Sequence, residues 1–142
     1  GLGVVNAVDR LDSNDFYVPG SILTVELESG RASNRGLGES VSAWFWRSSR
    51  AFEVSDPDVT VTARYGSGNP LLSGWILGPE YLAGRPAVVE ATVGNGSVVL
   101  IGFQPNYRSQ SMSTWPLLFN VLDPVVRERP RTDKGQGMEG PR

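Results

Sequence analysis

The sequence contains no cysteine and no histidine among its 142 residues. Without these side chains the segment cannot form a disulfide, a Cys nucleophile, a Ser-His-Asp triad or a zinc site built from cysteine and histidine. The lack of cysteine is compatible with any redox compartment. We therefore expect no catalytic residue, no metal ligand set and no cofactor within this segment.

An excess of charge of one sign is also missing. Thirteen basic and fifteen acidic residues give a formal net charge of −2, so the chain has no broad basic field of the kind that binds nucleic-acid backbones. No run of 18 or more apolar residues occurs, which predicts that no helix spans a membrane. Nucleic acid and a membrane span are therefore not expected.

A strand, a tight turn and a second strand are predicted between residues 87 and 103. Residues 87–93 read as a strand, and Gly94-Asn95-Gly96 suits a tight turn because these residue types tolerate positive φ. Residues 97–103 are apolar almost without interruption. A half-exposed strand would alternate, so we expect this strand to be central and buried on both faces.

A helix is predicted after the polar loop at residues 104–113. It begins at Thr114 or Trp115 and carries Pro116 in its first turn, where a missing N–H costs nothing. Pro124 ends it at about Asp123. The apolar residues repeat at helical spacing and predict one buried face. They are Leu117, Leu118, Val121 and Leu122.

Two further strands are indicated by alternation. Residues 59–65 alternate strictly, which predicts a strand. Residues 16–28 alternate beyond Pro19-Gly20, which predicts a strand with one solvated face that lies nearer the edge of the sheet than residues 97–103. Shorter extended segments are expected near the N-terminus and at 41–47, 51–54 and 71–77. We expect one α/β domain over residues 1–126. The polar tail at 127–142 has too few apolar residues to offset the entropy of ordering, which predicts disorder.

Three separated stretches resemble a known domain. Residues 87–122 read AVVEATVGNGSVVLIGFQPNYRSQSMSTWPLLFNVL, and FYVPGSILTVEL (16–27) and LLSGWILGPEYLAGRPAVVE (71–90) precede them in the same order. They resemble the class I glutamine amidotransferase-like domain that follows the peptidase domain in bacterial zinc carboxypeptidases of the carboxypeptidase A-like class. The matching positions in the last stretch are Gly96, Val98, Val99, Leu100, Gly102, Phe103, Pro105, Tyr107, Arg108, Thr114, Leu117, Leu118, Phe119, Asn120 and Leu122.

The resemblance implies a partial flavodoxin-like or glutamine amidotransferase-like domain with a C-terminal helix. Because the strand–helix units that usually open this domain are missing, we expect a strand-rich mixed sheet. The resemblance implies a non-catalytic accessory domain, with zinc and peptide hydrolysis in the upstream peptidase domain. Expected partners are that domain or a second copy of this one. The sequence does not indicate a location, and the resemblance implies a secreted or periplasmic parent protein.

The loop after residues 97–103 is the first candidate site. In open α/β sheets, ligands bind beyond the carboxyl ends of strands, and an arginine there could hold a carboxylate or phosphate. The alternative is that Arg108 and Gln104 tie the loop to the sheet by hydrogen bonds to backbone carbonyls. In the family a histidine often occurs near the position of Met112, and its absence here disfavours catalysis. The candidates are Gln104, Asn106, Tyr107, Arg108 and Gln110.

The tryptophans form the second candidate site. Trp44, Trp46 and Trp75 are candidates for an aromatic surface that binds carbohydrate or cell wall, because sugars stack on exposed indole rings. The other interpretation is core packing: if Phe45 faces outward, alternation turns its two tryptophan neighbours inward. A carbohydrate-binding module is therefore the alternative to the accessory docking domain, and anion sensing through Arg108 is a third hypothesis.

Overall fold

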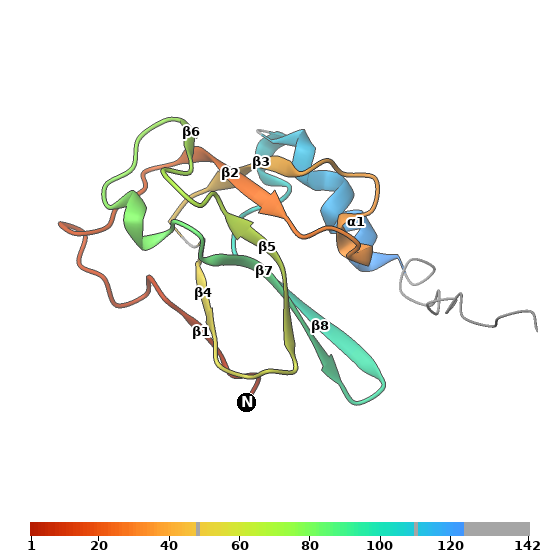
Figure 1. Ribbon diagram of the computed structural model, residues 1–142. Helices are drawn as coiled ribbons and strands as arrows, with labels where there is room; N and C mark the ends of the chain where they lie inside the picture. Colours follow the sequence, from red (N-terminus) through yellow and green to blue (C-terminus); the bar gives the residue numbers. More distant parts are fainter. Residues whose placement is uncertain (48, 110, 124–142) are drawn as a thin grey trace, which may run out of the picture.

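The computed structural model describes residues 1–47, 49–109 and 111–123, so Gln110 and the predicted disordered tail lie outside the described residues. Within them the chain forms strands, short 3-10 turns and one α-helix (Figure 1). The strands are β1 (Val4–Asn6), β2 (Ser21–Leu27), β3 (Ser40–Phe45), β4 (Phe52–Val54), β5 (Val59–Tyr65), β6 (Leu71–Ser73), β7 (Pro86–Val93) and β8 (Gly96–Ile101). The helical segments are η1 (Ala32–Asn34), η2 (Pro79–Tyr81), η3 (Tyr107–Ser109), η4 (Met112–Thr114) and α1 (Trp115–Leu122).

A curled antiparallel sheet forms the body of the molecule. Its strand order is β3-β2-β5-β7-β8, with β6 also paired to β2, and β1 and β4 form a separate two-stranded sheet. The strand-rich α/β class with a C-terminal helix is confirmed. The expected mixed sheet is not confirmed, because every strand pair among the described residues is antiparallel. A parallel pair needs a long crossover connection, whereas turns and loops join these strands.

The two ends of the sheet meet beyond β8, at a place that we call the closing seam. There the Gly102 amide donates to the carbonyl of Ala87 at 2.8 Å, and its own carbonyl accepts from the Arg50 amide. Two residues later, the amide of Gln104 donates to the Trp44 carbonyl in β3 at 3.1 Å. A β-carbon at Gly102 would overlap the Arg50 carbonyl oxygen. Only glycine therefore allows the backbones to approach this closely.

The predicted hairpin at residues 87–103 is confirmed. Val93 pairs with Gly96 across a two-residue turn, in which Gly94 has a φ of 58°. A residue with a side chain rarely adopts this left-handed conformation, so glycine suits the turn.

The predicted central position of residues 97–103 is wrong. Among the described strands, β8 pairs with β7 alone and lies at the end of the sheet order, and its residues are exposed or half-buried. Val99 and Ile101 pack against the main core, and Leu100 packs against a smaller core beside β4. The strand is apolar on both faces because it contacts two cores. The strand that is buried on both faces is β7.

The predicted edge position of residues 16–28 is also wrong. β2 has β3 along one side and β5 and β6 along the other. Leu23 and Val25 are buried, whereas Ile22 and Thr24 on the outer face are half-buried. In an antiparallel sheet, alternation therefore reports one solvated face, even when both edges of the strand are paired.

The predicted strand at 59–65 and the predicted helix are confirmed. β5 has the predicted bounds. α1 begins at Trp115, has Pro116 in its first turn and ends at Leu122. Leu117 is fully buried in the main core and Val121 packs against that core.

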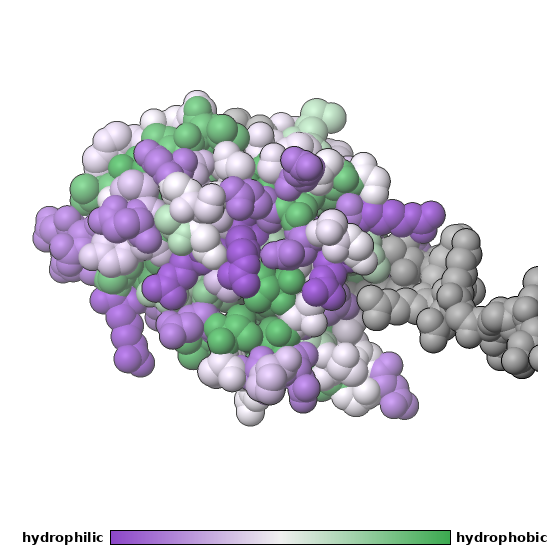
Figure 2. Space-filling view, viewed as in Figure 1, coloured by the Kyte–Doolittle hydropathy of each residue, from purple (hydrophilic) through white to green (hydrophobic). Residues whose placement is uncertain are grey.

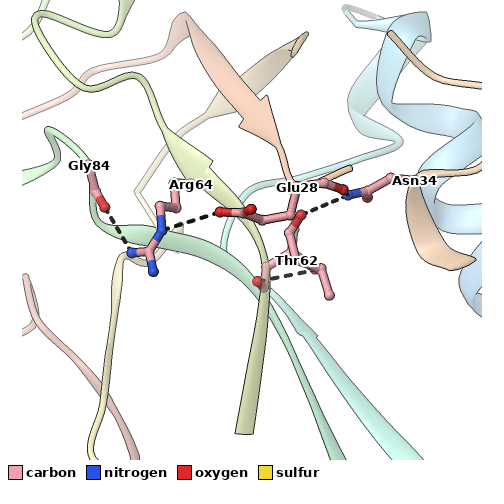
Figure 3. A network of polar contacts seen from close by, with 6 residues as sticks. Glu28, Asn34, Thr62, Arg64 and Gly84 are labelled. Carbon is pink, nitrogen blue, oxygen red and sulfur yellow. Dashed lines mark hydrogen bonds and ion pairs between the residues drawn. The ribbon is translucent and has the colours of Figure 1, made fainter. Parts of the chain in front are cut away.

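A buried asparagine fixes η1 to the sheet. The Asn34 side-chain amide donates to the carbonyls of Glu28 at 2.8 Å and Thr62 at 2.7 Å (Figure 3). Nearby, the Arg64 side chain donates to the Gly84 carbonyl at 3.2 Å and lies 3.7 Å from the Glu28 carboxylate. These contacts join η1, β5 and the end of β2, and so provide a rigid base for α1.

Tyr65 connects β5 to the closing seam. Its ring is fully buried and meets Phe45 edge-on at 5.6 Å, while its hydroxyl donates to the Arg50 carbonyl at 2.7 Å. Burial raises the pKa of the Tyr65 hydroxyl well above its ordinary value of 10.0, because the phenolate would lose its hydration.

Replacing Tyr65 with phenylalanine keeps the ring and removes this donor. We expect the Tyr65→Phe change to lower the free energy of unfolding by about 1–2 kcal/mol at neutral pH, because the part-buried hydrogen bond to the Arg50 carbonyl is lost. Urea unfolding measures the difference.

The same pair of proteins tests the raised pKa. Above pH 10 the unfolded chain releases the Tyr65 proton more readily than the folded chain. The stability that neutral Tyr65 contributes is thus present below pH 10 and is lost as the pH rises beyond it. The original protein should lose more unfolding free energy than Tyr65→Phe between about pH 9 and pH 11. Equal losses would contradict the prediction.

Candidate functional site

The structure brings parts of the two predicted site groups together. Tyr107, from the loop after β8, stacks on Trp44 with ring centres 5.4 Å apart and an angle of 2° between the planes. Trp46 lies 5.4 Å from the same tyrosine ring at a tilt of 54°. We call Trp44, Trp46 and Tyr107 the aromatic cluster. It lies on the outer face of β3.

Serine and threonine side chains hold the loop against β3. Ser111 and Ser113 both donate hydroxyl hydrogen bonds to the Ser42 carbonyl, and the Ser42 amide donates to the Ser113 hydroxyl at 3.1 Å. Thr114 donates from its hydroxyl to the Pro105 carbonyl at 2.7 Å. The loop is thus fastened to β3 through the hydroxyl groups of Ser111 and Ser113. The sequence interpretation assigned such a role to Arg108 and Gln104 and did not single out these serines.

The alternation expected for the tryptophans is reversed. Phe45 is buried in the main core, whereas Trp44 and Trp46 are half-buried on the outer face. Val41 and Ala43 share the inward side with Phe45. The sequence held a signal for this arrangement, because serines alternate with Val41 and Ala43 and occupy the outward positions that the tryptophans continue.

Trp44 is not an open platform for a ligand. Tyr107 stacks on its ring, and a β-carbon at Gly20 would lie only 3.0 Å from Cζ2 of the indole. The indole nitrogen is buried and has no hydrogen-bond partner among the described residues. The main role that this geometry supports for Trp44 is packing between β3, the loop and the chain before β2.

Arginines border the aromatic cluster. The Arg108 guanidinium carbon lies 5.5 Å from the ring centre of Tyr107, and that of Arg47 lies 5.8 Å from the ring centre of Trp46. Such exposed cation–π contacts stabilise by about 0.5–1 kcal/mol. Arg108 and Ser109 have φ of 45° and 56°, a left-handed conformation that strains residues with side chains and that often occurs at functional loops.

Trp75 lies apart from the aromatic cluster. Its ring is 6.2 Å from that of Tyr17, and the two side chains are 52% and 42% exposed. The Ser21 hydroxyl donates to the Trp75 carbonyl at 2.7 Å and accepts from the Trp75 amide at 2.9 Å. The remaining candidates are also dispersed: the Gln104 backbone belongs to the closing seam, and Asn106 is exposed.

An apolar stripe on α1 is the site feature that the sequence interpretation missed. Met112, Phe119 and Leu122 are 67%, 60% and 68% exposed, and half-buried Trp115 meets Phe119 edge-on at 6.5 Å. The intervals of three or four residues place Trp115, Phe119 and Leu122 along one side of α1, and Met112 precedes them in η4. We call Met112, Trp115, Phe119 and Leu122 the α1 stripe. The expected burial of Leu122 is therefore wrong.

The polar side of α1 faces the protein. Asn120 is the single polar residue within the helix. Its side-chain amide donates to the carbonyls of Ser33 at 3.1 Å and Arg35 at 2.8 Å. A surface helix normally turns its apolar side to the core and its polar side to water. Here the buried side includes the polar group, and the exposed side is apolar.

The part of the chain that the structure describes offers neither a metal-binding cluster nor a membrane-spanning helix. Within it, no three His, Cys, Asp or Glu side chains lie close enough together to hold a metal ion. None of its helices has both the length and the apolar character needed to cross a membrane.

Comparisons with protein-family models, curated proteins and solved structures found no match to this chain. The resemblance described from the sequence therefore stays a prediction, and the functional argument depends on the geometry of the site.

Removing the Tyr107 ring should uncover Trp44. In the variant Tyr107→Ala we expect acrylamide to quench a larger fraction of the tryptophan fluorescence, and the unfolding free energy to fall by about 1–2 kcal/mol because a stacked aromatic pair is lost. Tyr17→Ala is the matched control, since its partner Trp75 is already half exposed. Equal gains in quenching in the two variants would contradict the stacked arrangement.

Proposed function

We propose that this chain is a non-catalytic interaction domain that docks on a second protein surface through the α1 stripe. The observation that carries the proposal is the apolar side that α1 still exposes after Leu117 and Val121 have packed on the core. Asn120 donates two hydrogen bonds inward to backbone carbonyls, while Phe119 and Leu122 are exposed. Covering such a face releases water from apolar surface, which drives protein association.

The α1 stripe offers apolar surface whose burial would favour docking. Fully burying a side chain such as Phe, Leu or Met contributes about 1.5–3 kcal/mol, and three of the four members of the stripe are mostly exposed. Aromatic residues in the centre of an interface are frequent hot spots. Phe119 lies between Trp115 and Leu122 along the helix and would occupy that central place.

The resemblance supplies the finer part of the proposal. Under it, the chain is part of a partial flavodoxin-like or glutamine amidotransferase-like accessory domain in a bacterial zinc carboxypeptidase-like protein. The upstream peptidase domain would hold the zinc and hydrolyse peptides, and the α1 stripe would dock on that domain or on a second copy of this one. The supporting observation is that Phe119 and Leu122, which match the family pattern, are exposed in this fold.

Because the chain has no cysteine, a single introduced thiol reports cleanly on exposure. We expect maleimide to label Phe119→Cys at least about tenfold more slowly in the longest natural polypeptide that contains this chain than in the isolated chain, since tenfold protection needs only about 1.4 kcal/mol of docking energy. Leu72→Cys is the matched control, because Leu72 is 56% exposed and lies in β6, away from α1.

Protection at position 119 alone supports docking within the longer protein. Protection that appears in the isolated chain as its concentration rises supports docking between two copies. Equal labelling of positions 119 and 72 under all these conditions would overturn the proposal.

Carbohydrate binding is the second candidate, and the exposed pair Tyr17 and Trp75 favours it. Apolar side chains also reach the surface above β6 in Figure 2, so this end of the sheet offers a ring surface on which a sugar could stack. Titration with polysaccharide should shift the tryptophan fluorescence of the original protein and leave that of Trp75→Ala unchanged. No shift in either protein would remove this candidate.

A further inference from the structure

A cavity of about 350 Å³ opens between the N-terminal segment and the chain that follows β3. This volume lies within the range of small-ligand pockets. Part of the wall is apolar: Val8, Val18 and Phe45 belong to the main core, and Leu11 and Phe16 pack against it. An apolar group of a ligand could therefore be buried here.

The rim of the cavity is cationic. Arg47, Arg50 and Asp9 line it, so the lining carries one excess positive charge on a chain whose net charge is −2. The Arg50 guanidinium lies 3.5 Å from the Asp9 carboxylate. Arg47, in contrast, forms no ion pair with any described residue, and its guanidinium lies over the Trp46 ring. An anion would be drawn to Arg47, because Asp9 repels it from Arg50.

A buried hydroxyl adds a second polar group to the cavity. Ser49 is 7% exposed and lines the cavity, and its oxygen accepts a hydrogen bond from the Trp46 amide at 2.9 Å. Its own O–H has no acceptor among the residues that the structure describes. Buried hydroxyl groups usually have partners for both roles, so this hydrogen atom is free to donate to a bound anion.

We infer that the cavity binds a small carboxylate that carries an apolar group. The apolar group would pack against the apolar part of the lining, and the carboxylate would accept hydrogen bonds from Arg47 and Ser49. Hydrogen bonds between an arginine and a carboxylate are charge-assisted and directional. Two sources offer this chemistry: a fatty acid, and the C-terminal residue of a peptide with an apolar side chain.

Four probes separate the two sources and test the charge requirement. Octanoate represents a fatty acid and N-acetyl-L-phenylalanine represents a peptide C-terminus, while octanol and N-acetyl-L-phenylalanine amide lack the carboxylate. Calorimetry measures binding, and Trp46 fluorescence reports movement of Arg47 from its ring. We expect at least one carboxylate to bind with a dissociation constant below about 1 mM, and its uncharged counterpart to bind at least about tenfold more weakly.

Substitutions in the lining test whether the carboxylate binds in the cavity. Arg47→Gln should weaken binding of the carboxylate at least about tenfold, or about 1.4 kcal/mol, while Arg31→Gln, an exposed arginine outside the cavity, should leave it unchanged. Ser13→Phe places a bulky group at an exposed position of the lining and should also block binding.

The preferred carboxylate identifies the source of the ligand. Three results would overturn the inference: no binding of either carboxylate to the folded original protein, equal binding of the uncharged counterparts, or undiminished binding to Arg47→Gln. These measurements use the isolated chain and do not depend on docking through the α1 stripe.

Discussion

The close approach of the Gly102 backbone to Arg50 joins the two ends of the curled sheet. Without room for a side chain at this point, the backbone can hydrogen-bond to β7 and to the chain before β4 and then reach β3 at Gln104. That last contact places the following loop along β3, where Tyr107 stacks on Trp44. The aromatic cluster is thus a consequence of the closing seam, which also covers an edge of β3 that would otherwise be unpaired.

The closing seam also fixes the rim of the cavity. The Arg50 amide and carbonyl are both engaged, by Gly102 and by the Tyr65 hydroxyl, so the backbone that carries the cationic rim is held on two sides. Ser49 is held in the same segment through its bonds with Trp46. A site on such a segment loses little conformational entropy when a ligand binds, because its groups are already ordered.

Local features of the fold could be predicted from the sequence, and contacts between distant segments could not. The turn at Gly94 and the start of α1 at Pro116 follow from backbone preferences of single residues. The position of β8 in the sheet does not follow from such preferences, because an apolar run is equally compatible with a central strand and with an end strand that contacts two cores. In the closing seam Gly102 contacts Arg50, about fifty positions earlier in the chain. The presence of a glycine at position 102 does not predict which residue it contacts.

For the candidate site, too, residue types could be predicted from the sequence, whereas contacts between distant residues could not. Sequence reasoning selected Trp44, Trp46 and Tyr107 by residue type, but only the fold shows that they form one cluster. The outward direction of the tryptophans could have been read from the serines earlier in β3. The α1 stripe was missed because a helix that is apolar almost all round has no distinct buried face, so its pattern does not say which side meets the core.

The two proposed surfaces lie on different parts of the molecule, and their chemistry differs. Figure 1 shows the N-terminal segment that lines the cavity on one side of the view and α1 on the other, so a partner on α1 would leave the cavity open. The fold itself accounts for the inward direction of Asn120. Its side-chain amide donates hydrogen bonds to the carbonyls of Ser33 and Arg35, and these bonds fix the helix. The fold does not account for apolar side chains at 119 and 122, where polar residues would preserve every described backbone contact. Phe119 already meets the Trp115 ring edge-on, and under the proposal a docked surface would cover the remaining exposed apolar area of both side chains.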